Sequence, residues 1–179
     1  MNNPTIADIY AGNEKIHEKL KATLESLTEE QASSLPDGEK WTISQIVEHL
    51  SIVDEGMSKI CSKLLSKAQS DGKISDGTVK ISPGFVEKGA EIAVMKLEAP
   101  ERVHPSADAS IAESISEMDE NRKRLDQIRQ LFETYDCNEG KFLHPFLGDI
   151  SAVEWLTLVG RHKARHLRQI ENLLEKIGQ

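Results

Sequence analysis

The sequence of 179 residues predicts an all-α protein, a four-helix bundle with a long crossover between its second and third helices. Four long segments place apolar residues at steps of three and four, the period of an amphipathic helix. Two of these segments begin with a capping box. No segment alternates apolar and polar residues convincingly, so no strand is predicted. We expect residues 1–179 to form one domain, because a chain of this length can bury a sizeable core.

The first helix is expected over residues 5–27, and a polar connection over residues 28–40 follows it. The apolar side chains of the helix recur on one face and the charged ones lie opposite, as in a helix that packs on a core. The connection contains Leu35-Pro36-Asp37-Gly38, which is typical of a turn.

The second helix is expected from Ile43 to Lys67, and its start is well marked. Thr42 is the N-cap, and Gln45 three residues later completes the capping box. Trp41 and Ile46 flank this box as a hydrophobic staple. The core-facing stripe that follows consists of Ile43, Ile46, Leu50, Val53, Met57, Ile60 and Leu64.

Glycine and proline residues punctuate residues 70–108, which we expect to be a long crossover over one end and side of the bundle. A short helix is expected within it, over Glu87–Leu97. Such a crossover lets the next helix run parallel to the preceding one. That third helix is expected over residues 110–134, and a loop over residues 135–149 leads to the last helix.

The last helix is expected to end at Ile177, and its start has the same form as that of the second. Ser151 is the N-cap, Glu154 completes the capping box, and Ile150 and Trp155 form the staple. Two positions of its core-facing stripe are histidine. The stripe consists of Trp155, Val159, His162, His166, Ile170, Leu173 and Ile177.

The histidines of the second and last helices form a candidate metal site. His162 and His166 lie four residues apart, so their rings occupy one side of the helix on consecutive turns. His49 lies at the edge of the apolar stripe of the second helix and can complete the site if the two helices meet. Zinc and similar ions bind neutral imidazole, and three protein ligands leave a position open for water or substrate. The alternative is three partly buried histidines that hydrogen-bond to neighbours.

The residues around these histidines lack a general base. Lys163, Ala164 and Arg165 separate the pair, so the glutamate of the H-E-x-x-H metalloprotease motif is absent. Glu48 precedes His49, but adjacent helix positions point about 100° apart. We therefore expect Glu48 to be a solvated charge.

Other polar residues have two possible interpretations. His17 and His104 have no partner at ligand spacing and are expected at the surface. His144, which precedes a proline, either caps its loop or leans over the mouth of the site. Three arginines of the last helix form a solvated face or recognise an anionic substrate or thiol cofactor; they are Arg161, Arg165 and Arg168.

Composition narrows the classes of partner and compartment. The net charge of −8 argues against nucleic acid or an anionic membrane surface as a partner. Cys61 and Cys137 have no ligand spacing, and Cys61 is expected to be a small buried apolar residue. We expect no disulfide, no signal peptide and no membrane span, which together fit a cytoplasmic protein.

Three segments resemble the DinB-like superfamily. They are W-T-I-S-Q-I-V-E-H-L at residues 41–50, H-P-F-L-G-D-I-S-A-V-E-W-L at residues 144–156, and R-H-K-A-R-H-L-R-Q-I at residues 161–170. The resemblance is closest to the branch of metal-dependent hydrolases and low-molecular-weight-thiol transferases, and it covers nearly the whole chain. It implies an up-down-down-up bundle, a homodimer, and a zinc or nickel ion held by His49, His162 and His166.

The resemblance also implies a range of activities on small molecules. Some members transfer bacillithiol, mycothiol or glutathione, and others isomerise maleylpyruvate. We expect a metal-dependent thiol S-transferase or hydrolase in which the metal activates a thiol, as co-substrate, or water. The alternative is a metal-binding or stress-associated helical bundle without turnover.

Overall fold

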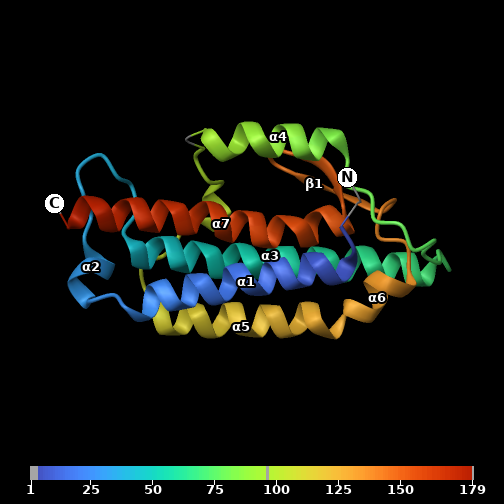
Figure 1. The fold of residues 1–179 in the computed structure, drawn as a ribbon, viewed down its shortest axis with the longest axis horizontal. Coiled ribbons are helices and arrows are strands. Elements are labelled where there is room, and N and C mark those ends of the chain that lie inside the picture. Colours follow the sequence, from blue (N-terminus) through green and yellow to red (C-terminus); the bar gives the residue numbers. More distant parts are fainter. Residues whose placement is uncertain (1–3, 96, 179) are drawn as a thin grey trace.

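The computed structural model describes residues 4–95 and 97–178, in which four long helices lie side by side (Figure 1). These helices are α1 (Ile6–Glu25), α3 (Ile43–Ser70), α5 (Ile111–Gln127) and α7 (Ala152–Ile177). The connecting elements are α2 (Glu29–Ser33), α4 (Pro83–Val94), the 3-10 helix η1 (Glu101–Val103), α6 (Arg129–Thr134), and the strands β1 (Lys141–His144) and β2 (Gly148–Ser151).

The helices follow the expected up-down-down-up order. α1 and α7 run in one direction and α3 and α5 in the other, as the colours of Figure 1 show. Near the start of both parallel helices α1 and α7, the Asn13 side chain donates to the Leu156 carbonyl at 2.9 Å. Near the end of α3, Cys61 Sγ lies 3.8 Å from the carbonyl of Ala152, the first residue of the antiparallel α7. α3 therefore presents its first half to the second half of α7.

Two apolar clusters fill the bundle, and a polar layer lies between them. One cluster contains Met57 of α3 and Trp155 of α7, and the other contains Leu50 of α3 and Ile170 of α7. Burying such side chains stabilises the fold by about 1.5–3 kcal/mol each. Between the clusters, the helices carry buried polar side chains instead: His17, His49, Asp54, Asn121, Lys163 and His166.

The capping boxes of α3 and α7 are confirmed. The Thr42 hydroxyl accepts from the Gln45 backbone at 3.2 Å, and the Gln45 side chain accepts from the Thr42 backbone at 3.0 Å. Ser151 and Glu154 make the same reciprocal pair at the start of α7. Local sequence thus sets where each histidine-bearing helix begins.

Removing either cap should destabilise the protein. We expect Thr42→Ala and Ser151→Ala each to lower the free energy of unfolding by about 0.5–2 kcal/mol, because a helix N–H loses its acceptor. Urea denaturation measures the loss. Ser62→Ala, which removes a hydroxyl from the interior of α3, is the control and should change stability less. Equal losses in all three variants would show that the caps have no special role.

Helix ends differ from the expectation by up to three residues, as at Ser70 of α3, and three larger differences also occur. α4 begins four residues before Glu87, because Ser82 caps it and Pro83 occupies its first turn; proline and glycine there had indicated only a turn. The short helix α2, with its own capping box at Thr28, lies in a connection expected to be irregular. The expected third helix is interrupted at Ile128, so that α5 and α6 are separate. Apolar periodicity does not detect an interruption of one residue.

The expectation of a strandless loop at residues 135–149 is wrong. β1 and β2 pair antiparallel, with Lys141 opposite Ser151 and His144 opposite Gly148. Gly148 has a φ of 77°, a conformation that favours glycine. Each strand has only four residues, too short for an alternating pattern to be recognised in the sequence. The hairpin leads directly into α7.

Two further expectations concern burial and membrane segments. Cys61 is buried, as expected for a small apolar residue. Cys137 is buried as well, and both cysteines are free. Within residues 4–95 and 97–178, each helix is too short or too polar to span a lipid bilayer.

Candidate metal centre

The fold brings together the three histidines that the sequence singles out. The His49 ring on α3 lies 5.2 Å from the His162 ring and 5.0 Å from the His166 ring on α7, between centroids. The His162 and His166 centroids are 4.5 Å apart. One nitrogen from each ring lies within 4.8 Å of the other two. The predicted convergence is confirmed.

Hydrogen bonds define which nitrogens face the centre. His49 Nδ1 lies 2.8 Å from the Val103 carbonyl, which can only accept, so Nδ1 carries the proton and Nε2 keeps its lone pair. His166 Nδ1 lies 2.9 Å from the Gln169 side-chain oxygen. Its Nε2 faces His162 Nε2 at 3.2 Å. These outer contacts orient the rings as partners of metal-binding histidines do.

Burial keeps these imidazoles neutral. Burial is the main cause of the lowered pKa of all three histidines. The pKa of His49 is lowered, that of His162 lies well below its usual value, and that of His166 is lowered to about 3. Neighbouring histidines and Arg165 lower the pKa of His162 further. Since a metal ion binds the neutral ring, all three side chains are in the ligating form at pH 7.

The lowered pKa values predict how the metal-free protein responds to acid. Below pH 6.5 or so, the unfolded chain protonates His162 and His166 while the folded chain keeps both rings neutral. The contribution of the neutral rings to the free energy of unfolding is therefore fully present above that pH. It is lost as the pH falls toward the pKa of the folded protein, which is about 3 for His166.

A urea titration of the metal-free protein at several pH values measures this slope. Each unprotonated histidine contributes up to about 1.4 kcal/mol per pH unit. We expect His166→Gln to flatten the slope between pH 6 and 5, as no ring titrates at that position in the unfolded chain. An unchanged slope would show that His166 is not held neutral by the fold.

The three side chains fit a divalent transition-metal ion. Bonds of about 2.0–2.1 Å from one ion to two imidazoles place the nitrogens about 3.0–3.4 Å apart, depending on the angle. The 3.2 Å between His162 Nε2 and His166 Nε2 lies in that range. An all-nitrogen set suits zinc or nickel rather than magnesium or calcium. Three ligands also leave further positions open.

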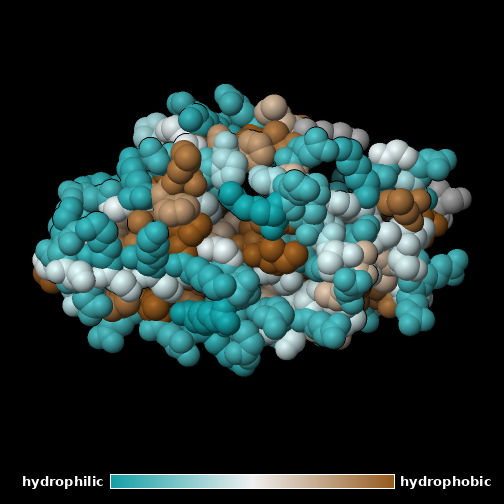
Figure 2. Space-filling view, turned by 180° about the vertical axis from the view of Figure 1, so that it is seen from behind, coloured by the Kyte–Doolittle hydropathy of each residue, from teal (hydrophilic) through white to brown (hydrophobic). Residues whose placement is uncertain are grey.

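A groove between α4 and the bundle leads to the histidines. Its volume is about 2070 Å³, and His49, His162 and His166 line it with apolar residues of α3, α4 and the hairpin. Figure 2 shows the surface hollowed beneath α4, with apolar surface below it. The Trp41 ring packs 5.0 Å from the His49 ring. The candidate centre is thus open to a small molecule.

Comparison with known proteins agrees with this architecture. The family model of the DinB superfamily matches residues 13–170. The chain belongs to the DinB superfamily. It is also similar to the uncharacterized protein YuaE of Bacillus subtilis (strain 168), with 27% identity over 158 residues that cover 86% of this chain and 90% of YuaE. The resemblance based on the three segments is therefore confirmed.

Two expectations about polar residues of this DinB chain are wrong. Glu48 is buried, and it accepts hydrogen bonds from Ser106 and Ala107 of the crossover instead of facing solvent. His17 is also buried, and its Nε2 lies 2.7 Å from an oxygen of Asp119 on α5. Both errors have one cause, because each partner lies far away in the sequence and no local pattern reveals it.

The structure also tests the expectations for His104, His144 and the arginines of α7. His104 is exposed, as predicted. His144 caps its loop, since Nδ1 accepts from the backbone of Phe146 and Leu147 at 3.2 and 3.1 Å, and it also lines the groove. The three arginines of α7 have different environments. Arg165 donates to the carbonyls of Ile92 in α4 and of Met95 just after it. The Arg161 guanidinium lies 5.0 Å from the Phe85 ring, and Arg168 is exposed at the groove.

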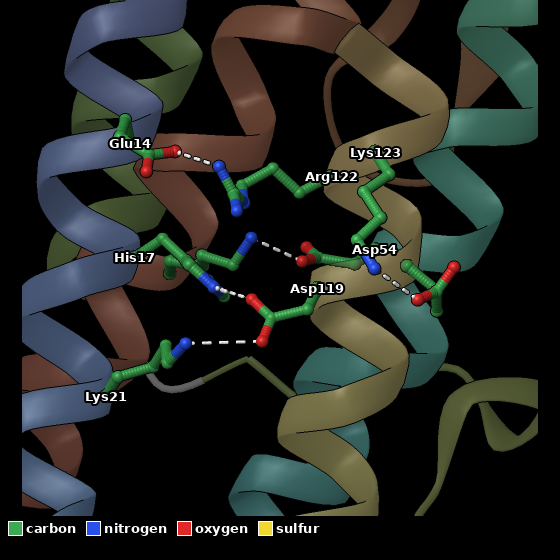
Figure 3. Close-up of polar contacts among 9 residues, drawn as sticks. Glu14, His17, Lys21, Asp54, Asp119, Arg122 and Lys123 are labelled. Carbon is green, nitrogen blue, oxygen red and sulfur yellow. Dashed lines mark hydrogen bonds and ion pairs between the residues drawn. The ribbon is translucent and has the colours of Figure 1, made fainter. Parts of the chain in front are cut away.

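A buried ion pair behind the centre was not predicted. Lys163 Nζ pairs with an Asp54 oxygen, and both side chains are at most 4% exposed. Figure 3 shows Asp54 beside the ion pairs that join α1 to α5, among them His17 with Asp119 and Glu14 with Arg122. The sequence contained a signal of this burial, because Asp54 lies four residues after Leu50 and so falls within a helical stripe of buried apolar residues.

Proposed function

We propose that His49, His162 and His166 hold one zinc or nickel ion and that the protein is a metal-dependent thiol S-transferase. The observation that carries the proposal is the convergence of two buried imidazoles and one half-buried imidazole, with ring nitrogens within 4.8 Å of one another, at a groove open to small molecules. Membership of the DinB superfamily supports it. Hydrolysis at the same site is the related alternative chemistry.

The surrounding residues favour a thiol over water as the activated group. When bound, the ion would lower the pKa of a thiol or water that occupies an open position. Both buried carboxylates of α3 are already engaged, Glu48 by the crossover and Asp54 by Lys163. Neither is a free general base. A thiol needs none, because coordination alone deprotonates it.

The groove supports a substrate with apolar and anionic parts. Phe85, Phe146 and Trp155 are among its lining residues and suit an apolar electrophile. Arg168 lines the groove and is exposed, so it can pair with an anionic group of the thiol. Arg165 is held by the α4 carbonyls and is a poorer candidate for that role.

We further propose that the protein is a cytoplasmic homodimer. Six large apolar side chains on or next to α4 and the hairpin are exposed, and such a patch on one side of a chain supports an interface. The two free cysteines agree with a reducing compartment. The six exposed residues are Val86, Val94, Met95, Phe142, Leu143 and Phe146.

Turnover separates the enzyme from a metal-binding protein without activity. Purified protein, loaded with zinc or nickel, is incubated with low-molecular-weight thiols and monobromobimane as a model electrophile. We expect conjugation that requires the metal, disappears in His166→Ala and persists in the control Lys123→Ala, whose exposed side chain on α5 is not part of the groove lining. Metal binding with no conjugation of any thiol would favour the non-catalytic alternative.

A further inference from the structure

Glu48 holds the last part of the crossover to the start of α3. Its carboxylate accepts from the Ser106 backbone at 2.9 Å, from the Ser106 hydroxyl at 2.6 Å and from the Ala107 backbone at 2.9 Å. The side chain is only 5% exposed. A buried carboxylate with three donors is a strong anchor, because charge-assisted hydrogen bonds are short and costly to leave unmade.

The same short segment carries the partner of His49. The Val103 carbonyl, three residues before Ser106, accepts from His49 Nδ1 at 2.8 Å. Ala107 has a φ of 67°, which is unfavourable for a residue other than glycine. Its backbone N–H donates to Glu48, so the strained conformation is held by the same carboxylate. Two consecutive residues of α3 thus hold residues 103–107, one by anchoring the segment and the other by using its carbonyl.

We propose that Glu48 is a positioning residue for the histidine centre. By fixing residues 103–107 it keeps the Val103 carbonyl against His49 Nδ1, which holds His49 in the Nδ1–H tautomer. The lone pair of Nε2 then faces His162 and His166. The effect on metal affinity rests on the proposed function, but the effect on the tautomer does not.

The other end of the crossover provides a matched comparison. Glu154 accepts from the Ser82 backbone at 2.9 Å and from the Ser82 hydroxyl at 2.5 Å, in the pattern that Glu48 makes with Ser106. Ser82 caps α4, and in the part of the chain that the structure describes, the site histidines bond to Val103, Gln169 and each other and not to the segment around Ser82. Ser82→Ala and Ser106→Ala therefore remove equivalent hydrogen bonds at opposite ends of the crossover, and only the second should affect His49.

The test measures the His49 tautomer in the metal-free protein and zinc affinity separately. Long-range ¹H–¹⁵N NMR spectra at pH 7.5, with chelator present, distinguish a protonated from an unprotonated ring nitrogen. We expect one tautomer, with the proton on Nδ1, in the wild type and in Ser82→Ala, and a mixture in Glu48→Ala and Ser106→Ala. Glu48→Gln keeps one oxygen for both Ser106 donors but loses the acceptor of the Ala107 N–H, so it should fall between the wild type and Glu48→Ala.

Competition titrations with a zinc chelator then give the affinities. We expect Glu48→Ala to weaken zinc binding 10–100-fold, as loss of an outer partner of a ligand does, with a smaller loss in Ser106→Ala and none in Ser82→Ala. An unchanged His49 tautomer in Glu48→Ala would overturn the proposal. If that variant does not fold, an unchanged tautomer in Ser106→Ala overturns it instead. A wild type that binds no zinc contradicts the proposed function, while the tautomer still decides the role of Glu48.

Discussion

We expect the replacement of His162 or His166 with alanine to abolish metal binding and to leave the bundle folded. The two apolar clusters lie on either side of the histidine centre and do not depend on it. Truncation removes packing, but it also removes a buried polar ring, which offsets part of the loss. Within residues 4–95 and 97–178, the buried Nδ1 of His162 has no hydrogen-bond partner, so this offset is larger for His162. The fold therefore persists without the imidazole.

Thermal unfolding with chelator and with excess zinc or nickel measures this outcome. An ion that binds only the folded wild type at 100 times its dissociation constant adds about 2.7 kcal/mol of stability. We expect His162→Ala and His166→Ala to melt near the metal-free wild type and not to respond to added metal, while the control Lys123→Ala, an exposed residue of α5 outside the groove, responds like the wild type. A variant that still gains stability from the ion would show that the binding site lies elsewhere. Failure of both variants to fold would mean that the histidines are structural.

Breaking the buried Asp54–Lys163 pair has the other large expected effect. Burial raises the pKa of Asp54, and the ammonium of Lys163 opposes that shift. Removing one partner leaves an uncompensated polar or charged group inside the bundle, which costs about 3–5 kcal/mol. We expect Asp54→Leu and Lys163→Met each to lose stability on that scale. The double variant should recover most of it, because apolar residues of similar volume replace the pair.

Urea denaturation of the two single variants and the double variant gives the coupling free energy. The exposed pair of Glu55 and Lys59 on α3 is the control, and its coupling should be at most about 1 kcal/mol. Losses from Asp54→Leu and Lys163→Met that simply add would contradict the interpretation. Since Lys163 adjoins His162, zinc affinity of the double variant also shows whether the pair influences the candidate centre.

The elements of the bundle could be predicted from the sequence because their signals are local. A capping box spans four residues, so Thr42 and Ser151 mark the starts of α3 and α7 without any other part of the fold. The spacing of His162 and His166 is also local, since the period of the helix alone places both rings on one side. The prediction that His49 joins this pair required one further assumption, namely that α3 and α7 pack against each other.

The hairpin and the break at Ile128 could not be predicted in this way. β1 and β2 have four residues each, and their backbone pairing depends on a turn built from Gly148 and His144. The break between α5 and α6 changes the backbone of a single residue while the apolar pattern continues. Such short features leave little trace in periodicity, because periodicity averages over several turns.

The sequence by itself determined the helices, their caps and the identity of the three histidines. Only the tertiary structure decided the environment of the charged residues. Glu48 is buried because Ser106, 58 positions away in the sequence, supplies its donors, and Asp54 is buried because Lys163 reaches it from another helix. A charge enters a protein interior only with a partner, and where that partner comes from distant sequence, the fold alone determines whether the charge is buried.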